Sequence, residues 1–295
     1  MIAIGPVSAR TDDGWLLRGE VLADGPRPAV ALLLHAMMAS RRSMDKPRGA
    51  GLGATLAAAG LSVVSMDLRG HGESGPSARD GARYTYDDCV LHDVPAAVAL
   101  ARSLFPGKRV VVVGHSLGAH AALASAGVFP DKAPDAVASI AGNFWFPSDE
   151  PSAMRRAAKA ATLRTWLGVA ETLGYFDPKP LGMGSDAVAL PYIRQFWKVW
   201  SSDRYGSLDD RYDYAEALTR VTCPVLAVAS EGDKLLAHPE PAQRFFARLG
   251  SARKTMRIVT NAERSGRAPD HMGLVTDPRS RPLWEEIATW AAALA

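Results

Sequence analysis

Several features that mark whole classes of protein are scarce in this sequence of 295 residues. It contains only two cysteines, Cys89 and Cys223, and their separation matches no metal or redox motif, which excludes a disulfide scaffold and a cysteine metal site. The 34 Lys and Arg residues nearly balance the 31 Asp and Glu residues. Because the basic residues are also scattered, nothing favours a nucleic-acid partner.

Long apolar runs and cofactor motifs are scarce as well. The N-terminal residues lack the basic segment and apolar stretch of a signal peptide, and the most apolar stretch, 29–39, is interrupted by His35. We therefore expect no membrane span and a cytoplasmic location. No phosphate-binding loop or zinc-protease motif occurs, and the glycines at 49–53 do not follow an expected strand. The sequence thus implies neither a cofactor nor a metal.

What remains is the pattern of a folded α/β protein, with 47% hydrophobic and 22% charged residues. Residues 7–23 alternate around Asp12-Asp13-Gly14 and predict a hairpin. The continuous apolar run 29–35 predicts a strand that is buried on both faces. Further strands are expected at 61–66, 109–113, 136–140, 224–229 and 255–259, with helices at 52–59, 86–104, 116–128, 239–249 and 282–294. Such alternation predicts a mostly parallel sheet with helices on both faces.

One long stretch, 143–215, breaks this alternation and holds more than half of the chain's Phe, Trp and Tyr residues. We interpret it as a helical cap inserted after the sixth strand, with residues 1–142 and 216–295 forming the core. The aromatic side chains either form an apolar wall over a ligand site or only attach the cap to the core.

The motif with the clearest chemical meaning is Gly114-His115-Ser116-Leu117-Gly118, between an expected strand and an alanine-rich helix. This G-x-S-x-G pattern is typical of a nucleophile elbow, a tight strand-to-helix turn that raises a serine hydroxyl above the sheet. The alternative is an ordinary turn flanked by glycines. The context of strand and helix favours the elbow.

With this motif the chain resembles the α/β-hydrolase superfamily over nearly its whole length. The supporting residues are the elbow, His35-Ala36-Met37-Met38, the segment 67–74, and an Asp and a His near the end. Parts of the cap, such as Gly174-Tyr175-Phe176, resemble an uncharacterised bacterial branch of predicted α/β hydrolases. The resemblance implies a serine hydrolase with a catalytic triad.

In this superfamily the nucleophile is followed along the chain by an acid and then by a histidine. The resemblance therefore implies Ser116 as nucleophile, Asp233 as orienting acid and His271 as general base. His238, close to the acid loop, is the rival base, and Glu231 is the alternative acid. Asp270 is interpreted as a loop residue.

The oxyanion hole and the substrate pocket are expected beside this triad. Backbone N–H groups of Met37 and Leu117 are the expected oxyanion donors, with Ala36 standing where the superfamily commonly has glycine. The expected substrate-binding residues are His35, His115, Phe144, Trp145 and Trp197.

The function that follows is a cofactor-independent, carboxylesterase-like serine hydrolase. Its expected partner is a small-molecule ester or thioester with a partly apolar acyl or alcohol group, cleaved through an acyl-enzyme. Two alternatives stay open: an acyltransferase that uses the same triad, and a binding protein that keeps the fold without turnover. The sequence specifies neither the natural substrate nor the oligomeric state.

Overall fold

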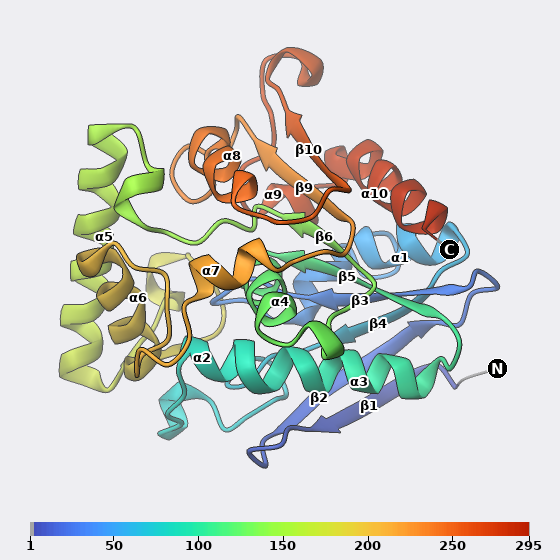
Figure 1. Cartoon of the computed structure of the whole chain (residues 1–295), viewed down its shortest axis with the longest axis horizontal. Helices are drawn as coiled ribbons and strands as arrows, with labels where there is room; N and C mark the ends of the chain where they lie inside the picture. The colour runs from blue at the N-terminus through green and yellow to red at the C-terminus, as the bar shows by residue number, and fades with distance from the viewer. Residues whose placement is uncertain (1–2, 295) are drawn as a thin grey trace.

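A single twisted sheet of eight strands organises the computed structural model, which describes residues 3–294 (Figure 1). The strand order is β1-β2-β4-β3-β5-β6-β9-β10. The strands β1 and β2 form the expected antiparallel hairpin and β2 pairs antiparallel with β4, whereas all other neighbours are parallel. The strands are β1 (Gly5–Arg10), β2 (Leu16–Ala23), β3 (Ala29–Leu34), β4 (Ser62–Met66), β5 (Arg109–His115), β6 (Ala136–Ile140), β9 (Val225–Ser230) and β10 (Lys254–Val259).

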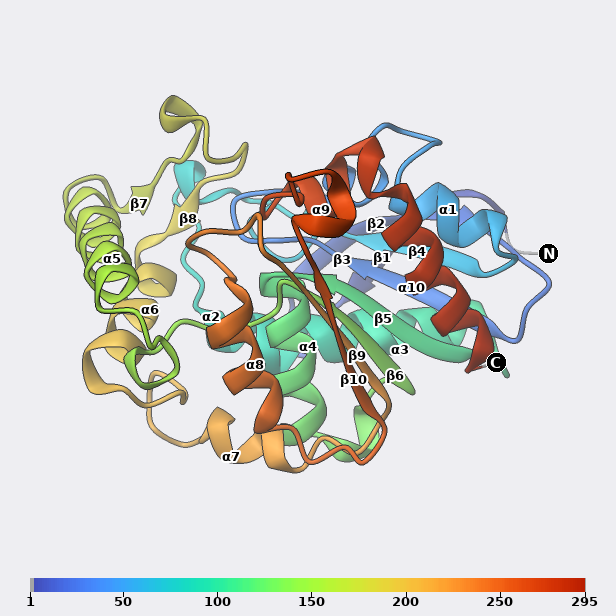
Figure 2. The same ribbon diagram turned by 90° about the horizontal axis from the view of Figure 1, so that it is seen from above.

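Helices cover both faces of this sheet, as expected. In Figure 2, α1 and α10 lie on one side of the strands, and α4 and α8 lie on the other; α3 shares a hydrophobic cluster with α4. The core helices are α1 (Leu52–Ala58), α2 (Tyr86–Asp88), α3 (Val94–Leu104), α4 (Leu117–Val128), α7 (Tyr214–Thr219), α8 (Pro239–Ala247), α9 (Gly273–Thr276) and α10 (Arg281–Ala293). Short 3-10 turns are η1 (Arg41–Asp45), η2 (Ala78–Asp80), η4 (Pro130–Lys132), η5 (Pro147–Asp149), η6 (Lys179–Leu181), η7 (Ala262–Arg264) and η8 (Pro278–Ser280).

The strand β3 lies in the centre of the sheet and explains the continuous apolar run in this part of the sequence. All of its residues are buried. Leu32 and Leu34 belong to the hydrophobic cluster that includes α3 and α4, whereas Ala31 and Leu33 belong to the cluster that includes α1 and α10. Successive side chains of a strand point to opposite faces, so a central strand must be apolar at every position. The prediction of a strand buried on both faces is confirmed.

One expected helix, 86–104, is interrupted in the structure. A π-helical turn, η3 (Cys89–Asp93), separates α2 from α3. Pro95 follows it at the start of α3 and has no N–H to donate to the carbonyl one turn earlier, while the N–H of Val94 bonds to the carbonyl of Cys89. The missing N–H of Pro95 thus coincides with the wider π-helical turn. The helical periodicity of the sequence did not predict this turn.

The aromatic insertion lies beside the sheet rather than within it (Figure 2). It contains α5 (Ala153–Leu173), the short antiparallel pair β7 (Tyr175–Phe176) and β8 (Val188–Ala189), and α6 (Leu190–Ser202). The β7–β8 pair was not predicted. Many aromatic side chains of the insertion belong to the cluster of buried residues that includes α3 and α4. One role of these side chains is therefore to pack the insertion against the core.

None of the helices in residues 3–294 combines the length and the apolar character that a membrane crossing requires.

Candidate active site

Ser116 stands alone between the end of β5 and the start of α4, in a backbone conformation with φ +50° and ψ −110°. The flanking glycines make this turn possible. A Cβ atom at Gly114 would lie 2.5 Å from the N atom of Ala119, and one at Gly118 would lie 2.4 Å from the carbonyl oxygen of Leu34. Strand, turn and helix therefore meet too closely for side chains at these two positions, as a nucleophile elbow requires.

His271 and Asp233 lie on the loops that follow β10 and β9, and their side chains meet. The Nδ1 atom of His271 is 2.6 Å from Oδ2 of Asp233. Because an ionised carboxylate only accepts hydrogen bonds, Nδ1 carries the proton and Nε2 is left as the basic nitrogen. The other carboxylate oxygen of Asp233 accepts the N–H of Leu236 at 2.9 Å.

Asp233 is kept ionised although only 2% of it is exposed. Burial by itself raises the pKa of this carboxyl. The attraction and hydrogen bond of His271, together with backbone N–H donors from Leu236 and Ala237, more than offset burial and hold the pKa below its ordinary value. Asp233 can therefore orient His271 and stabilise its positive charge.

Ser116 and His271 line one cavity of about 100 Å³. Its wall is formed by segments that follow β3, β5, β6, β9 and β10, together with residues of the insertion. The lining residues are Ala36, Met37, Met38, Ser116, His120, Asn143, Trp145, Trp166, Met183, Phe196, Leu236, His271 and Met272. The carboxyl ends of parallel strands thus bring residues far apart in the sequence to one site, as open α/β sheets do.

Two backbone N–H groups beside Ser116 and this cavity are candidate donors, one in the turn after β3 and one at the start of α4. Within residues 3–294, the N–H groups of Met37 and Leu117 donate no hydrogen bond to another part of the chain. Met38 has φ +65°, and its carbonyl accepts the N–H groups of Ser185 (2.9 Å) and Asp186 (3.2 Å) from the insertion. The insertion therefore holds the turn that carries one of the two candidate oxyanion donors.

This combination of sheet, elbow and converging loops agrees with what a comparison with known families shows. A sequence profile described as the alpha/beta hydrolase family matches residues 31–280. The chain belongs to this family. Its fold class and the resemblance expected from the sequence are thereby confirmed.

Solved structures with the same fold include lipases and esterases. A monoacylglycerol lipase of Paleococcus ferrophilus is 17% identical, with 100% of each chain covered and a TM-score of 0.61. An esterase of Pyrococcus furiosus is 18% identical, with 99% of this chain and 90% of that chain covered and a TM-score of 0.63. An esterase of a Rhodococcus species is 18% identical, with 99% and 100% covered and a TM-score of 0.61. At such identities the likeness shows the fold.

Of the five residues that were expected to bind substrate in this family member, the structure brings one to the cavity. Trp145 lines the cavity and donates a hydrogen bond from Nε1 to the carbonyl of Leu236 at 2.6 Å. The other four do not appear among the lining residues in the described part of the chain. They are His35, His115, Phe144 and Trp197.

Each of these four residues has another place in the structure. His35 is fully buried, with Nδ1 2.8 Å from the carbonyl of Ala36 and Nε2 accepting the N–H of Leu68 at 3.0 Å. Burial lowers its pKa, so neutral His35 ties together the loops after β3 and β4. Nε2 of His115 is 3.0 Å from the carbonyl of His271, whose backbone it supports.

The two aromatic residues are engaged in packing. Phe144 is 1% exposed and packs against Tyr86 and Phe196. Trp197 is half-buried, with the Arg164 guanidinium 5.0 Å above its ring. The aromatic count of the sequence could not separate such packing residues from lining residues.

The side chains of the alternative base and acid, His238 and Glu231, accept backbone N–H groups. His238 precedes α8, where Nδ1 accepts the N–H of Glu240 at 3.4 Å, and it does not line the cavity within the described residues. Glu231 accepts the N–H of Asn261 at 2.7 Å. Asp270 accepts the N–H of Gly273 at 2.7 Å, which agrees with its interpretation as a loop residue.

Several lining residues were not singled out from the sequence as part of the site. His120 lies one helical turn after Ser116, in α4, and therefore on the same face of this helix. Asn143 follows β6 at the carboxyl edge of the sheet, where parallel strands gather ligand-binding groups. Trp166 and Phe196 reach the cavity from α5 and α6.

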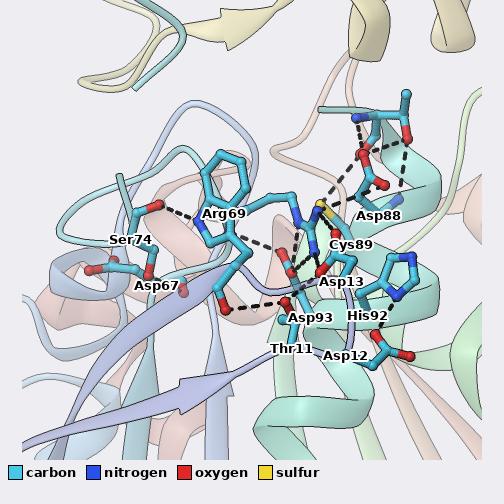
Figure 3. A network of polar contacts seen from close by, with 12 residues as sticks. Thr11, Asp12, Asp13, Asp67, Arg69, Ser74, Asp88, Cys89, His92 and Asp93 are labelled. Carbon is cyan, nitrogen blue, oxygen red and sulfur yellow. Dashed lines mark hydrogen bonds and ion pairs between the residues drawn. The ribbon is translucent and has the colours of Figure 1, made fainter. Parts of the chain in front are cut away.

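The loop after β4 is fixed by the buried cation Arg69 (Figure 3). Its Nε donates to Asp93 at 2.8 Å, and Nη1 donates to Asp13 at 2.7 Å. Burial lowers the pKa of Arg69, but attraction to Asp93 and the hydrogen bonds of both carboxylates raise it above its ordinary value. This loop also supplies the N–H of Gly72, which Asp186 of the insertion accepts at 2.8 Å.

Proposed function

We propose that this chain is a serine hydrolase that cleaves a small ester or thioester through an acyl-enzyme. The observation that carries the proposal is the 2.6 Å contact between Asp233 and His271, together with the cavity that His271 shares with Ser116. This arrangement supplies a nucleophile, a base with a defined protonated nitrogen and a buried anion.

In the proposed reaction, the Ser116 hydroxyl attacks the carbonyl carbon while Nε2 of His271 takes its proton. Asp233 stays ionised and stabilises the imidazolium that forms. The negative oxygen of the tetrahedral intermediate accepts hydrogen bonds from the N–H groups of Met37 and Leu117. When the intermediate collapses, the bond to the alcohol or thiol breaks and His271 returns the proton to that leaving group.

The second half of the reaction releases the acid. A water molecule gives a proton to His271 and attacks the acyl carbon attached to Ser116. The bond to the serine oxygen then breaks, the serine regains its proton from His271, and a carboxylic acid leaves.

Two neighbouring hollows match the two parts of such a substrate. The small cavity at Ser116 is mostly apolar and fits an acyl group. A groove of about 1080 Å³ is lined by Arg41, Glu73 and other residues, and it shares Met37, Met38, Met183 and Met272 with the cavity. We assign this larger, mixed polar and apolar groove to the alcohol or thiol part.

Labelling with a fluorophosphonate probe, followed by peptide mass spectrometry, tests the assignment of the nucleophile. We expect the label on Ser116 and its loss in Ser116→Ala and His271→Ala, whereas His238→Ala retains it. Folded wild-type protein that takes up no label, or a His238→Ala variant that fails while His271→Ala labels normally, would contradict the assigned roles. Product analysis with an added alcohol then separates hydrolysis from acyl transfer.

A further inference from the structure

Asn143 is a buried polar side chain without a partner. The residue is 7% exposed, and neither Oδ1 nor Nδ2 has a hydrogen-bond partner within the described chain. It lines the cavity that holds Ser116 and His271. Because buried polar groups are nearly always hydrogen-bonded in folded proteins, an unpaired donor and acceptor on a residue of this wall indicate a polar group of the ligand as their partner.

A second polar group of the same wall is His120. Its Nδ1 is 3.1 Å from the Tyr86 hydroxyl, which is itself hydrogen-bonded to the Tyr205 hydroxyl. Within residues 3–294, the Tyr205 hydroxyl has no hydrogen-bond partner other than Tyr86. Both hydroxyl protons are paired when Tyr205 donates to Tyr86 and Tyr86 donates to Nδ1 of His120, and we adopt this direction.

This direction of donation fixes the form of the imidazole. Burial lowers the pKa of His120 to about 3, so the ring is neutral near pH 7. With Nδ1 accepting, Nε2 carries the proton and has no partner within the described chain. His120 therefore contributes one N–H donor to the cavity, beside the carbonyl and the amide of Asn143.

The remaining wall is apolar apart from the reacting groups. Its large apolar side chains are those of Met37, Met38, Trp145, Trp166, Met183, Phe196, Leu236 and Met272. A hydroxyl group matches the polar part of this wall, since it donates one hydrogen bond and accepts two. A ketone oxygen could not donate to Oδ1 of Asn143, and an ammonium group could not accept from His120.

We propose that the cavity selects short acyl groups that carry a hydroxyl, bound by Asn143 and His120, so that the substrates are esters or thioesters of small hydroxy acids. The inference rests on the serine hydrolase function proposed above and names its substrate class. The cavity, at about 100 Å³, is small beside the neighbouring groove of about 1080 Å³, so we assign it a short acyl chain.

The test compares p-nitrophenyl butyrate with the p-nitrophenyl esters of 2-, 3- and 4-hydroxybutyrate. We expect wild type to prefer at least one hydroxylated ester by tenfold or more in kcat/KM, because a site built to bind a hydroxyl rejects the analogue without it. Asn143→Leu keeps the size of the side chain and removes both polar atoms, so the preference falls close to one. Leu236→Ala alters the apolar wall and retains the preference.

Two results would overturn the inference: a wild type that favours butyrate over every hydroxylated isomer, or an Asn143→Leu variant that keeps the wild-type preference. If wild type hydrolyses none of the four esters, the proposed function itself fails on these substrates. The selection is then measured without turnover in Ser116→Ala, from the rise in unfolding midpoint with hydroxybutyramides against butyramide. Equal rises for both kinds of amide contradict the inference.

Discussion

The N–H of Ser185 donates to the carbonyl of Met38 at 2.9 Å, so the insertion and the turn after β3 are joined directly. Asp186 reinforces the contact through its own N–H and through its carboxylate, which accepts the N–H of Gly72. One short segment of the insertion therefore touches the loops after both β3 and β4. The position of the Met37 N–H depends on a part of the chain that is not in the sheet.

The first prediction concerns Gly184, which lets these two segments approach. A Cβ atom there would lie 2.2 Å from the Met38 carbonyl oxygen, so Gly184→Ala displaces the turn. We expect kcat for p-nitrophenyl butyrate to fall by about 10²-fold, the usual effect of losing one oxyanion donor, with a smaller change in KM. Steady-state kinetics measures both.

The matched control is Gly168→Ala in α5. Gly168 is exposed and has open space around its Cβ position, so this variant keeps its activity and gains up to about 1 kcal/mol of stability from better helix propensity. Equal activities of the two alanine variants would show that the insertion does not position the turn.

The second prediction separates the two aspartates near His271. Asp233→Asn keeps the shape of the side chain, but its amide favours the wrong tautomer of the histidine, and kcat falls by about 10⁴-fold. Asp270→Asn retains the oxygen that accepts the N–H of Gly273 and stays within about threefold of wild type. A large loss in Asp270→Asn with an active Asp233→Asn would exchange the roles.

Part of this site was predictable because its signals are local. Ser116 lies in a five-residue motif whose glycines are required by contacts that every elbow makes, and the run of β3 follows from burial on two faces. Asn143 and His120 carry no such signal. Their meaning depends on which polar atoms find partners after folding, which is set by segments far away in the sequence. The β7–β8 pair, two residues per strand, is also too short for any periodicity.

The third prediction is a loss of stability in mild acid. Burial lowers the pKa of His120 to about 3 and, with repulsion from His35, that of His71 to about 4. The unfolded chain binds protons at these histidines near pH 6.5, while the folded chain does not. Stability therefore falls as the pH drops below 6.5, by about 2 kcal/mol per histidine at pH 5.

Urea unfolding at pH 7 and pH 5 measures this effect. His120→Gln removes the share of the pH dependence that comes from His120. A stability that is equal at the two pH values in wild type would show that these histidines are not held neutral.

The fourth prediction concerns Arg69 and its carboxylates (Figure 3). Arg69→Met leaves Asp93 fully buried without its cation, and we expect a loss of about 3–5 kcal/mol in the free energy of unfolding. Arg194→Met removes a pair with Glu171 in which both side chains are exposed and leaves that free energy nearly unchanged. Urea unfolding of both variants at neutral pH makes the comparison.

The central claim is a covalent intermediate on one serine. It is tested most directly by rapid mixing with p-nitrophenyl butyrate, followed by acid quenching and peptide mass spectrometry. The account predicts a burst of p-nitrophenol and a butyryl group on Ser116. The fraction of protein that carries this group increases when deacylation is slowed. Turnover in which the acyl group is found on another residue, or hydrolysis by Ser116→Ala at the wild-type rate, would contradict it.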